Sequence, residues 1–329
     1  MIPRFYSFLL KNQVIFALIL LVGGYFIYSI RGILVLLFLS YIIMAALLPA
    51  VHLLLRFKFP RVLAVLIPFI VTLCFLLLMI FPLIPFFFQQ IESLFVNFPL
   101  YIGQTLRSVG ISLDVRQIQG YISPNVSDIG RNAFAVSSKV FGGLISTLTI
   151  LIVSFYLLLS HDKFQRSISK LFHRDLRESV VVTMNQIDDK LGAWMRGQLV
   201  LCLSIGVLTW IALSLLNLPY ALPLALIAAI FEALPTIGPI LAAVPALIVA
   251  FTLSPNLAIF VAIIYFIIQT LENNVLVPKI MQHAVGLNPV IVIVGIMIGG
   301  SLMGIPGALL SIPFISFLTV LFSNLNEID

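Results

Sequence analysis

Two glutamates lie inside long apolar runs of this chain, and their type and position could support transport chemistry. Glu232 comes three residues before a break rich in proline and glycine, and Glu272 lies in a polar band at 269–274. An ionisable side chain within a membrane span is costly, so each is a candidate for function. Burial favours the neutral form of a carboxyl group, so either glutamate could carry a proton.

The polar band around Glu272 could also bind a solute or an ion. Helical spacing places Gln269, Glu272 and Asn273 on one face, with Asn274 next to them. A carboxylate and neighbouring amides could replace the hydration shell of a polar solute or a monovalent cation. The alternative is structural, because polar side chains also join membrane helices by hydrogen bonds. Both interpretations stay open for the band and for Glu232.

Two breaks in the apolar sequence would have to position these groups. The run 222–252 is interrupted at 234–239 and the run 289–322 at 304–307, in each case by proline and glycine, which end helices. The arms 222–234 and 239–252 would each be roughly 20 Å long, shorter than a bilayer core of about 30 Å. We therefore expect re-entrant hairpins. Their break residues are further pathway candidates: Pro235, Thr236, Gly238, Pro239, Gly304, Pro306 and Gly307.

The two hairpins occur in the same sequence context. The apolar run 197–218 precedes the first, and the run 256–277 precedes the second. If both breaks open a hairpin, the two span-plus-hairpin units run in opposite directions across the bilayer. Such an inverted repeat is typical of secondary transporters, with the substrate held near the middle of the membrane.

Composition sets the class of the whole chain. Its 329 residues are 61% hydrophobic and 9% charged, with a mean hydropathy of +1.19, which predicts a membrane protein. Water-soluble enzymes, disulfide-stapled secreted domains and disordered chains are excluded. The net charge of +6 comes from basic residues placed mostly between apolar runs, so we expect no nucleic-acid partner. Cys74 and Cys202 lie in separate apolar runs and predict neither a disulfide nor a zinc site.

The expected fold is an all-α polytopic membrane protein with about six full spans and two helical hairpins, or about eight membrane elements. Six runs are long enough to span: 12–30, 33–55, 62–88, 140–160, 197–218 and 256–277. The expected organisation is a three-span region at 1–88, an extracytoplasmic insertion at 89–139, a fourth span at 140–160, a cytoplasmic amphipathic linker at 161–196, and a transport core with both hairpins at 197–329.

Basic residues predict the orientation, because cytoplasmic loops carry the excess of lysine and arginine. Basic residues concentrate at 4–11, 56–61 and 163–177. We therefore expect a multi-pass protein of the cell inner membrane with both termini in the cytoplasm. The linker 161–196 has a helical period and would lie in the headgroup plane, or act as a gate or a docking helix. We expect its His161 and His173 to be solvated.

Other motifs are few. Gly295, Gly299, Gly300 and Gly304 allow close helix packing, a moving seam or a homo-oligomer. No His-Glu-x-x-His, Gly-x-Ser-x-Gly or Gly-Lys-Ser/Thr motif occurs, so we expect no enzyme, no metal and no cofactor, only H⁺ or Na⁺ as a coupling ion.

Four C-terminal strings together resemble one family. The segments 235–239 (Pro-Thr-Ile-Gly-Pro), 269–278 (Gln-Thr-Leu-Glu-Asn-Asn-Val-Leu-Val-Pro), 286–289 (Gly-Leu-Asn-Pro) and 299–304 (Gly-Gly-Ser-Leu-Met-Gly) resemble the autoinducer-2 exporter-like family of bacterial inner-membrane proteins. The resemblance implies export of a small furanosyl borate-type signalling molecule. It also implies an alternative, because some members resemble sodium or lithium/proton antiporters.

The leading hypothesis is therefore a secondary carrier or facilitator that exports a small polar solute, a molecule like autoinducer-2 by resemblance. Glu232 or Glu272 would couple it to protons or sodium. One alternative is a Na⁺(Li⁺)/H⁺ antiporter. The other is a non-transport envelope scaffold, whose insertion 89–139 and linker 161–196 would bind protein partners. In each case the chain also contacts membrane lipid.

Overall fold

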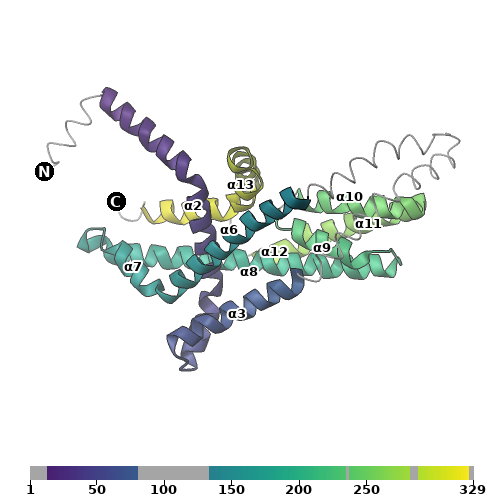
Figure 1. Ribbon diagram of the computed structural model, residues 1–329, viewed down its shortest axis with the longest axis horizontal. Helices are drawn as coiled ribbons and strands as arrows, with labels where there is room; N and C mark the ends of the chain where they lie inside the picture. The colour runs from purple at the N-terminus through teal and green to yellow at the C-terminus, as the bar shows by residue number, and fades with distance from the viewer. Residues whose placement is uncertain (1–12, 81–132, 235–236, 282–287, 326–329) are drawn as a thin grey trace.

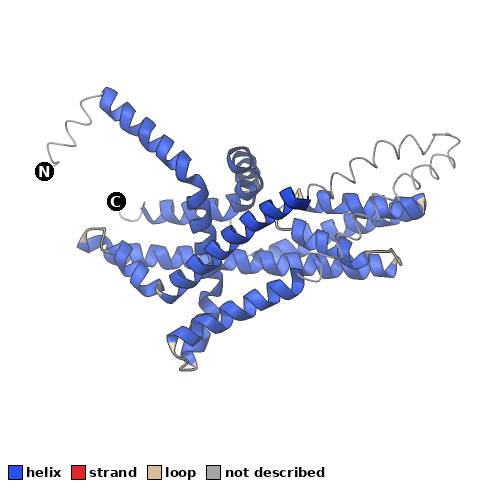
Figure 2. Cartoon of the chain, in the orientation of Figure 1, coloured by secondary structure: helices blue, strands red, loops and turns tan. Residues whose placement is uncertain are grey.

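The computed structural model describes residues 13–80, 133–234, 237–281 and 288–325, and every regular element in these ranges is helical (Figure 2). The predicted all-helical fold is confirmed for this part of the chain. The elements are α2 (Gln13–Arg56), α3 (Arg61–Ile80), α6 (Ala133–Leu159), α7 (His161–Ser169), η1 (Arg174–Leu176), α8 (Arg177–Leu215), α9 (Ala221–Phe231), α10 (Gly238–Leu253), α11 (Pro255–Leu271), η2 (Glu272–Leu276), α12 (Val277–Met281) and α13 (Pro289–Leu325).

Four helical stretches in the described ranges are long and apolar enough to cross a membrane: Leu21–Arg56, Arg174–Leu215, Pro255–Met281 and Val290–Asn324. A fifth is gained if α6 and α7, which are bent by 77° at Ser160, count as one broken span. The chain is thus a multi-pass membrane protein. About six spans and the inverted repeat stay predictions, and most of the insertion 89–139 lies outside the described residues.

The N-terminal region differs from the expected arrangement. The runs 12–30 and 33–55, expected as two spans, form the single helix α2 of 44 residues. Only Arg31 and Gly32 separate the runs, and one glycine costs a helix about 1 kcal/mol, which does not end it. At about 1.5 Å per residue α2 is about 66 Å long, roughly twice the thickness of a bilayer core.

Helix α8 forms the spine of the molecule and runs along most of its length (Figure 1). It has 39 residues and continues from the amphipathic linker into the predicted span without a break. Its length of about 58 Å exceeds what a span needs, so its polar N-terminal half extends beyond the apolar layer. Helices α2, α7, α9, α11, α12 and α13 all contact it.

The apolar core is divided between two halves of the molecule. Toward the N-terminus, α2 packs with α3 and α6 around Met44, and with α8, α12 and α13 around Trp194, which is 2% exposed. Toward the C-terminus, α8, α9, α10 and α11 enclose a second core around Ala228 and Ala246. Within a bilayer such helices are held together by close van der Waals packing and by hydrogen bonds, so both cores join other helices to α8.

Candidate functional site

The first predicted break is present and begins at Glu232. Helix α9 stops at Phe231, Glu232 is its C-cap, and α10 begins at Gly238 and packs against α9. Pro235 and Thr236 lie outside the described residues. A Cβ on Gly238 would overlap the carbonyl of Phe231, so the turn needs glycine at this position. Pro239 follows within the first turn of α10, where a missing N–H costs no hydrogen bond.

Glu232 is buried and only partly satisfied. Its side chain is 3% exposed, and its Oε2 atom has no hydrogen-bond partner among the described residues. The Gln198 side chain of α8 donates to the Glu232 backbone carbonyl over 2.8 Å, which fixes the turn but leaves the carboxyl group free. A buried polar group without a partner costs about 1–3 kcal/mol, so this arrangement calls for a ligand or a function.

Glu272 begins a π-helix. Residues 272–276 form η2 between α11 and α12, and Glu272 is 6% exposed. Single π-helical turns often occur at functional sites, because the extra residue shifts the side chains that follow. Gln269 is half-buried and its amide nitrogen lies 3.4 Å from Oδ1 of Asn273, while Asn273 and Asn274 are exposed. The band therefore has a buried acid and exposed amides.

The two glutamates lie beside the same apolar core. Phe231, which precedes Glu232, packs on the same buried group as Ile268 and Leu276, which flank Glu272. The two carboxyl groups are close enough to interact electrostatically. The structure thus brings together the two acidic candidates from α9 and η2, although 40 residues separate them in sequence (272 − 232).

The second predicted break also folds the chain back on itself. Gly304 has φ +65° and ψ −144°, a conformation that residues with a side chain rarely adopt. The Ser311 hydroxyl donates to the Gly295 carbonyl over 2.8 Å, whereas a straight helix would hold these residues about 24 Å apart. A Cβ on Gly299 or Gly307 would overlap the backbone of the other glycine. The arms of α13 therefore pack as a tight hairpin.

The tip of this second hairpin lies near α2. Gly304 and Pro306 are exposed, Gly307 is buried against Gly299, and the Arg31 guanidinium of α2 lies 3.5 Å from the Leu302 carbonyl.

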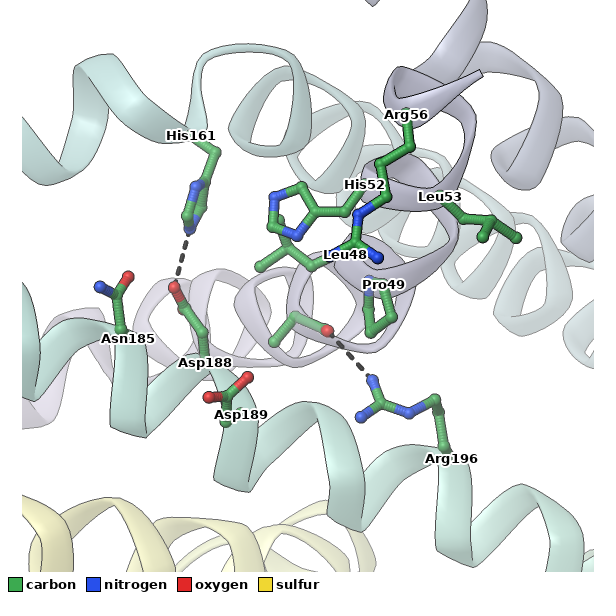
Figure 3. Close-up of a pocket in the computed structure, with 11 residues that line it drawn as sticks. Leu48, Pro49, His52, Leu53, Arg56, His161, Asn185, Asp188, Asp189 and Arg196 are labelled. Atoms are coloured by element: carbon green, nitrogen blue, oxygen red, sulfur yellow. Dashed lines mark hydrogen bonds and ion pairs between the residues drawn. The ribbon is translucent and has the colours of Figure 1, made fainter. Parts of the chain in front are cut away.

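A second polar cluster, which the sequence did not predict, joins α2, α7 and α8. We call it the Asp188 cluster: Tyr41, His161, Gln165, Asn185 and Asp188. Asp188 is buried at 5% exposure, and one of its carboxylate oxygens accepts from the Tyr41 hydroxyl. The other oxygen accepts from Gln165 at 3.1 Å and pairs with His161 Nε2 at 2.7 Å, the contact drawn in Figure 3. Gln165 also donates to Asn185 over 2.8 Å.

The cluster continues to the surface through a chain of charges. His161 Nδ1 lies 3.5 Å from Asp162, and Asp162 pairs with Arg61 of α3 at 2.6 Å. Burial by itself lowers the pKa of His161, but the hydrogen bond and charge of Asp188, together with Asp162, raise it above its usual range. The hydrogen bond from Arg61 lowers the pKa of Asp162. The two aspartates thus favour the protonated form of His161, and Arg61 pairs with Asp162.

The prediction that His161 is solvated is wrong, because its residue is 7% exposed. His173 is exposed, as expected. The available signal was the spacing of His161 and Gln165 on one face of α7, but their partner Asp188 lies 27 residues from His161. No group of three His, Cys, Asp or Glu residues in the described ranges could hold a metal ion.

Broken helices and buried acidic groups within a multi-pass helical fold are features of membrane transporters. A family model described as "AI-2E family transporter" matches residues 14–327, and the chain belongs to this family. The predicted resemblance is confirmed.

Individual relatives agree with this assignment. The chain is 28% identical over 296 residues to "Putative transport protein YueF" of Bacillus subtilis, covering 84% of this chain and 80% of that protein. It is 30% identical over 207 residues to "Putative transport protein YrrI" of the same organism, covering 63% of this chain but only 58% of the relative. "AI-2 transport protein TqsA" of Escherichia coli is 25% identical over 277 residues, covering 80% and 78%.

Proposed function

We propose that this protein is a secondary carrier or facilitator that exports a small polar solute across the bacterial inner membrane. The relative named as an AI-2 transport protein makes autoinducer-2 the first candidate solute. The observation that carries the proposal is the buried Glu232 carboxyl group, whose Oε2 has no partner among the described residues. A polar solute or an ion is the kind of partner this oxygen lacks.

The geometry suggests separate roles for Glu232 and Glu272 in solute binding and ion coupling. Glu232 lies at the break between α9 and α10, where freed backbone groups can bind a hydroxyl-rich solute. Glu272 lies across the same core on η2 and interacts with it electrostatically. A proton or Na⁺ shared by the two carboxyl groups would relieve their electrostatic repulsion. Its release would restore the repulsion, so the pair would alternate between an ion-bound and an ion-free state. Solute movement would thereby be coupled to an ion.

The orientation is part of the proposal. The basic residues Lys163, Arg166, Lys170 and Arg174 are exposed on α7 and the segment that follows it, which suits the cytoplasmic side. We propose that both termini lie on this side too. A cysteine introduced at Lys170 would then react with an impermeant thiol reagent only from the cytoplasm, and reaction from outside would refute this orientation.

Flux through reconstituted vesicles tests the proposal. Autoinducer-2 and other small polar solutes would be loaded into proteoliposomes holding wild type, Glu232→Gln, Glu272→Gln or Glu178→Gln, the last being an exposed glutamate on α8. We expect flux to fall at least about tenfold in the first two variants and to persist in the third, since a charge-assisted contact is worth about 1.5–3 kcal/mol. Undiminished flux in both core variants would refute the roles of these glutamates.

A second candidate function is monovalent cation/proton antiport. The electrostatically coupled pair Glu232 and Glu272 favours it, because two neighbouring carboxyl groups can exchange one proton for one cation. A pH-sensitive dye inside the proteoliposomes would report this exchange. Na⁺ or Li⁺ added outside would enter in exchange for protons and make the vesicle lumen more alkaline. No pH change, together with solute flux, would leave the carrier as the function.

A further inference from the structure

A cavity of about 640 Å³ lies between the C-terminal part of α2, the start of α7 and the middle of α8 (Figure 3). Its size falls in the range of sites that bind small molecules, about 300–1,000 Å³. It is separate from Glu232 and Glu272, neither of which lines it. The function proposed above does not use it.

One side of the cavity is basic. Arg196 of α8 donates to the carbonyl groups of Ala45 and Ala46 on α2 at 3.4 and 3.2 Å, which anchors its guanidinium at the wall. A guanidinium has five N–H donors, so others stay free for a ligand. Arg56 and His52 complete this side, and neither makes a hydrogen bond or an ion pair within the described part of the chain.

The acidic residues of the cavity do not cancel this charge. Asp188 is committed to Tyr41, His161 and Gln165, which use both of its carboxylate oxygens. Asp189 interacts electrostatically with Arg196. The charge of Arg56 is left without a counterpart in the described lining. The cavity therefore favours an anionic group, and arginine binds the oxygens of phosphate in a bidentate manner.

The rest of the lining distinguishes among phosphate-bearing ligands. Leu48, Pro49 and Leu53 of α2 form an apolar wall beside the basic side chains, and Leu53 is 55% exposed. Arg56 is the last residue of α2, and Arg196 immediately precedes the apolar stretch that begins at residue 197. Both cations thus lie where an apolar span meets a polar linker, the depth at which lipid headgroups lie. A soluble phosphate would gain nothing from the apolar wall.

We propose that this cavity binds the headgroup phosphate of an anionic phospholipid, with Arg56 and Arg196 as its ligands and the start of an acyl chain on Leu48 and Leu53. Basic pockets between helices at the cytoplasmic boundary are recognised sites for such headgroups. The bound lipid would bridge α2 and α8, the same two helices that Arg196 and the Asp188 cluster connect. Lipid composition would then control how firmly the N-terminal half is attached to the spine of the molecule.

Full-length protein in nanodiscs tests the site. Melting midpoints would be compared in phosphatidylcholine discs and in discs that also hold phosphatidylglycerol, for wild type, Arg56→Gln, Arg196→Gln and the control Arg174→Gln. Arg174 is an exposed arginine that does not line the cavity. We expect phosphatidylglycerol to raise the midpoint of wild type and of the control, and expect at least half of this increment to be lost in the two cavity variants.

Native mass spectrometry gives a second measurement, in which phosphatidylglycerol should bind Arg56→Gln about tenfold more weakly than wild type. Arg56 is exposed and makes no hydrogen bond or ion pair within the described residues, so this variant keeps the test valid even if Arg196→Gln unfolds. An unchanged increment in Arg56→Gln would overturn the proposal. An equal loss in all three variants would indicate diffuse attraction and would also overturn it. So would an equal increment from inorganic phosphate added to phosphatidylcholine discs.

Discussion

The molecule has two buried acidic sites, and they differ in how well their carboxyl groups are satisfied. In the Asp188 cluster both carboxylate oxygens have partners, from α2 and α7. At Glu232 the only side-chain donor from another helix, Gln198, reaches the backbone carbonyl, and Oε2 has no partner in the described structure. A satisfied buried acid holds helices together, whereas an unsatisfied one is available to bind something else.

The two sites also differ in the helices that they join. The Asp188 cluster joins two long unbroken helices, α2 of 44 residues and α8 of 39 residues, to the start of α7, beside the 77° bend at Ser160. Glu232 and Glu272 lie where helices are broken or π-helical, at the end of α9 and the start of η2. We infer that the first site serves stability and the second serves transport, and variants can test each half of this division.

The largest effect is expected from removing the centre of the satisfied site. Asp188→Ala leaves His161, Tyr41 and Gln165 without their shared acceptor, and breaking a buried charge pair in this way costs about 3–5 kcal/mol. The free energy of unfolding in mixed micelles would measure this cost. The matched control is Asp189→Ala, which removes the exposed carboxylate next to Asp188. This change should lower the free energy of unfolding by no more than about 0.5 kcal/mol. Equal stability of the two variants would remove the Asp188 cluster as a structural site.

The next effect concerns the second hairpin, which has no buried acid and depends on glycine geometry. Gly304→Ala forces a side chain into the φ +65° conformation and should cost about 1–3 kcal/mol. Gly300→Ala is the control, because its Cβ would make an ordinary contact with Ala308 at 3.8 Å in a helical conformation. If Gly304→Ala melts no lower than Gly300→Ala, the fold at Gly304 is not required.

A smaller, pH-dependent effect should come from His161. Its pKa is raised in the folded state, so its contribution to stability is complete below the unfolded value of about 6.5 and is lost as pH rises through the folded value. The melting midpoint of wild type should therefore decrease as the pH is raised from neutral to alkaline. His161→Gln should show a flatter profile over that interval. A profile of wild type that rises with pH would contradict the pairing of His161 with Asp188.

The sequence allowed much of the transport region to be predicted, because its signals are local. Proline and glycine marked the breaks at 232–237 and Gly304, and charge within apolar runs marked Glu232 and Glu272. The arrangement of the polar band 269–274 was harder to predict from the sequence. The π-helix at 272–276 alters the α-helical spacing that was used to place Gln269, Glu272 and Asn273 on one face.

The Asp188 cluster could not be predicted in the same way. Tyr41 and Asp188 are 147 residues apart, and neither stands out locally: Tyr41 lies in an apolar run and Asp188 among the charges of an amphipathic helix. Only the packing of α2 on α8 brings them together. The continuity of α2 was likewise missed, since a single arginine and glycine between apolar runs resemble a loop in composition but not in backbone geometry.

Solute flux per mole of folded protein in Glu232→Gln tests the division between the two sites most directly. Glutamine keeps the shape of the side chain and removes only its charge, and Oε2 has no hydrogen bond to lose within the described structure. We predict a melting midpoint close to that of wild type and a flux at least about tenfold lower. Normal flux in this variant, with a clearly lower melting midpoint, would show that Glu232 supports the fold rather than transport.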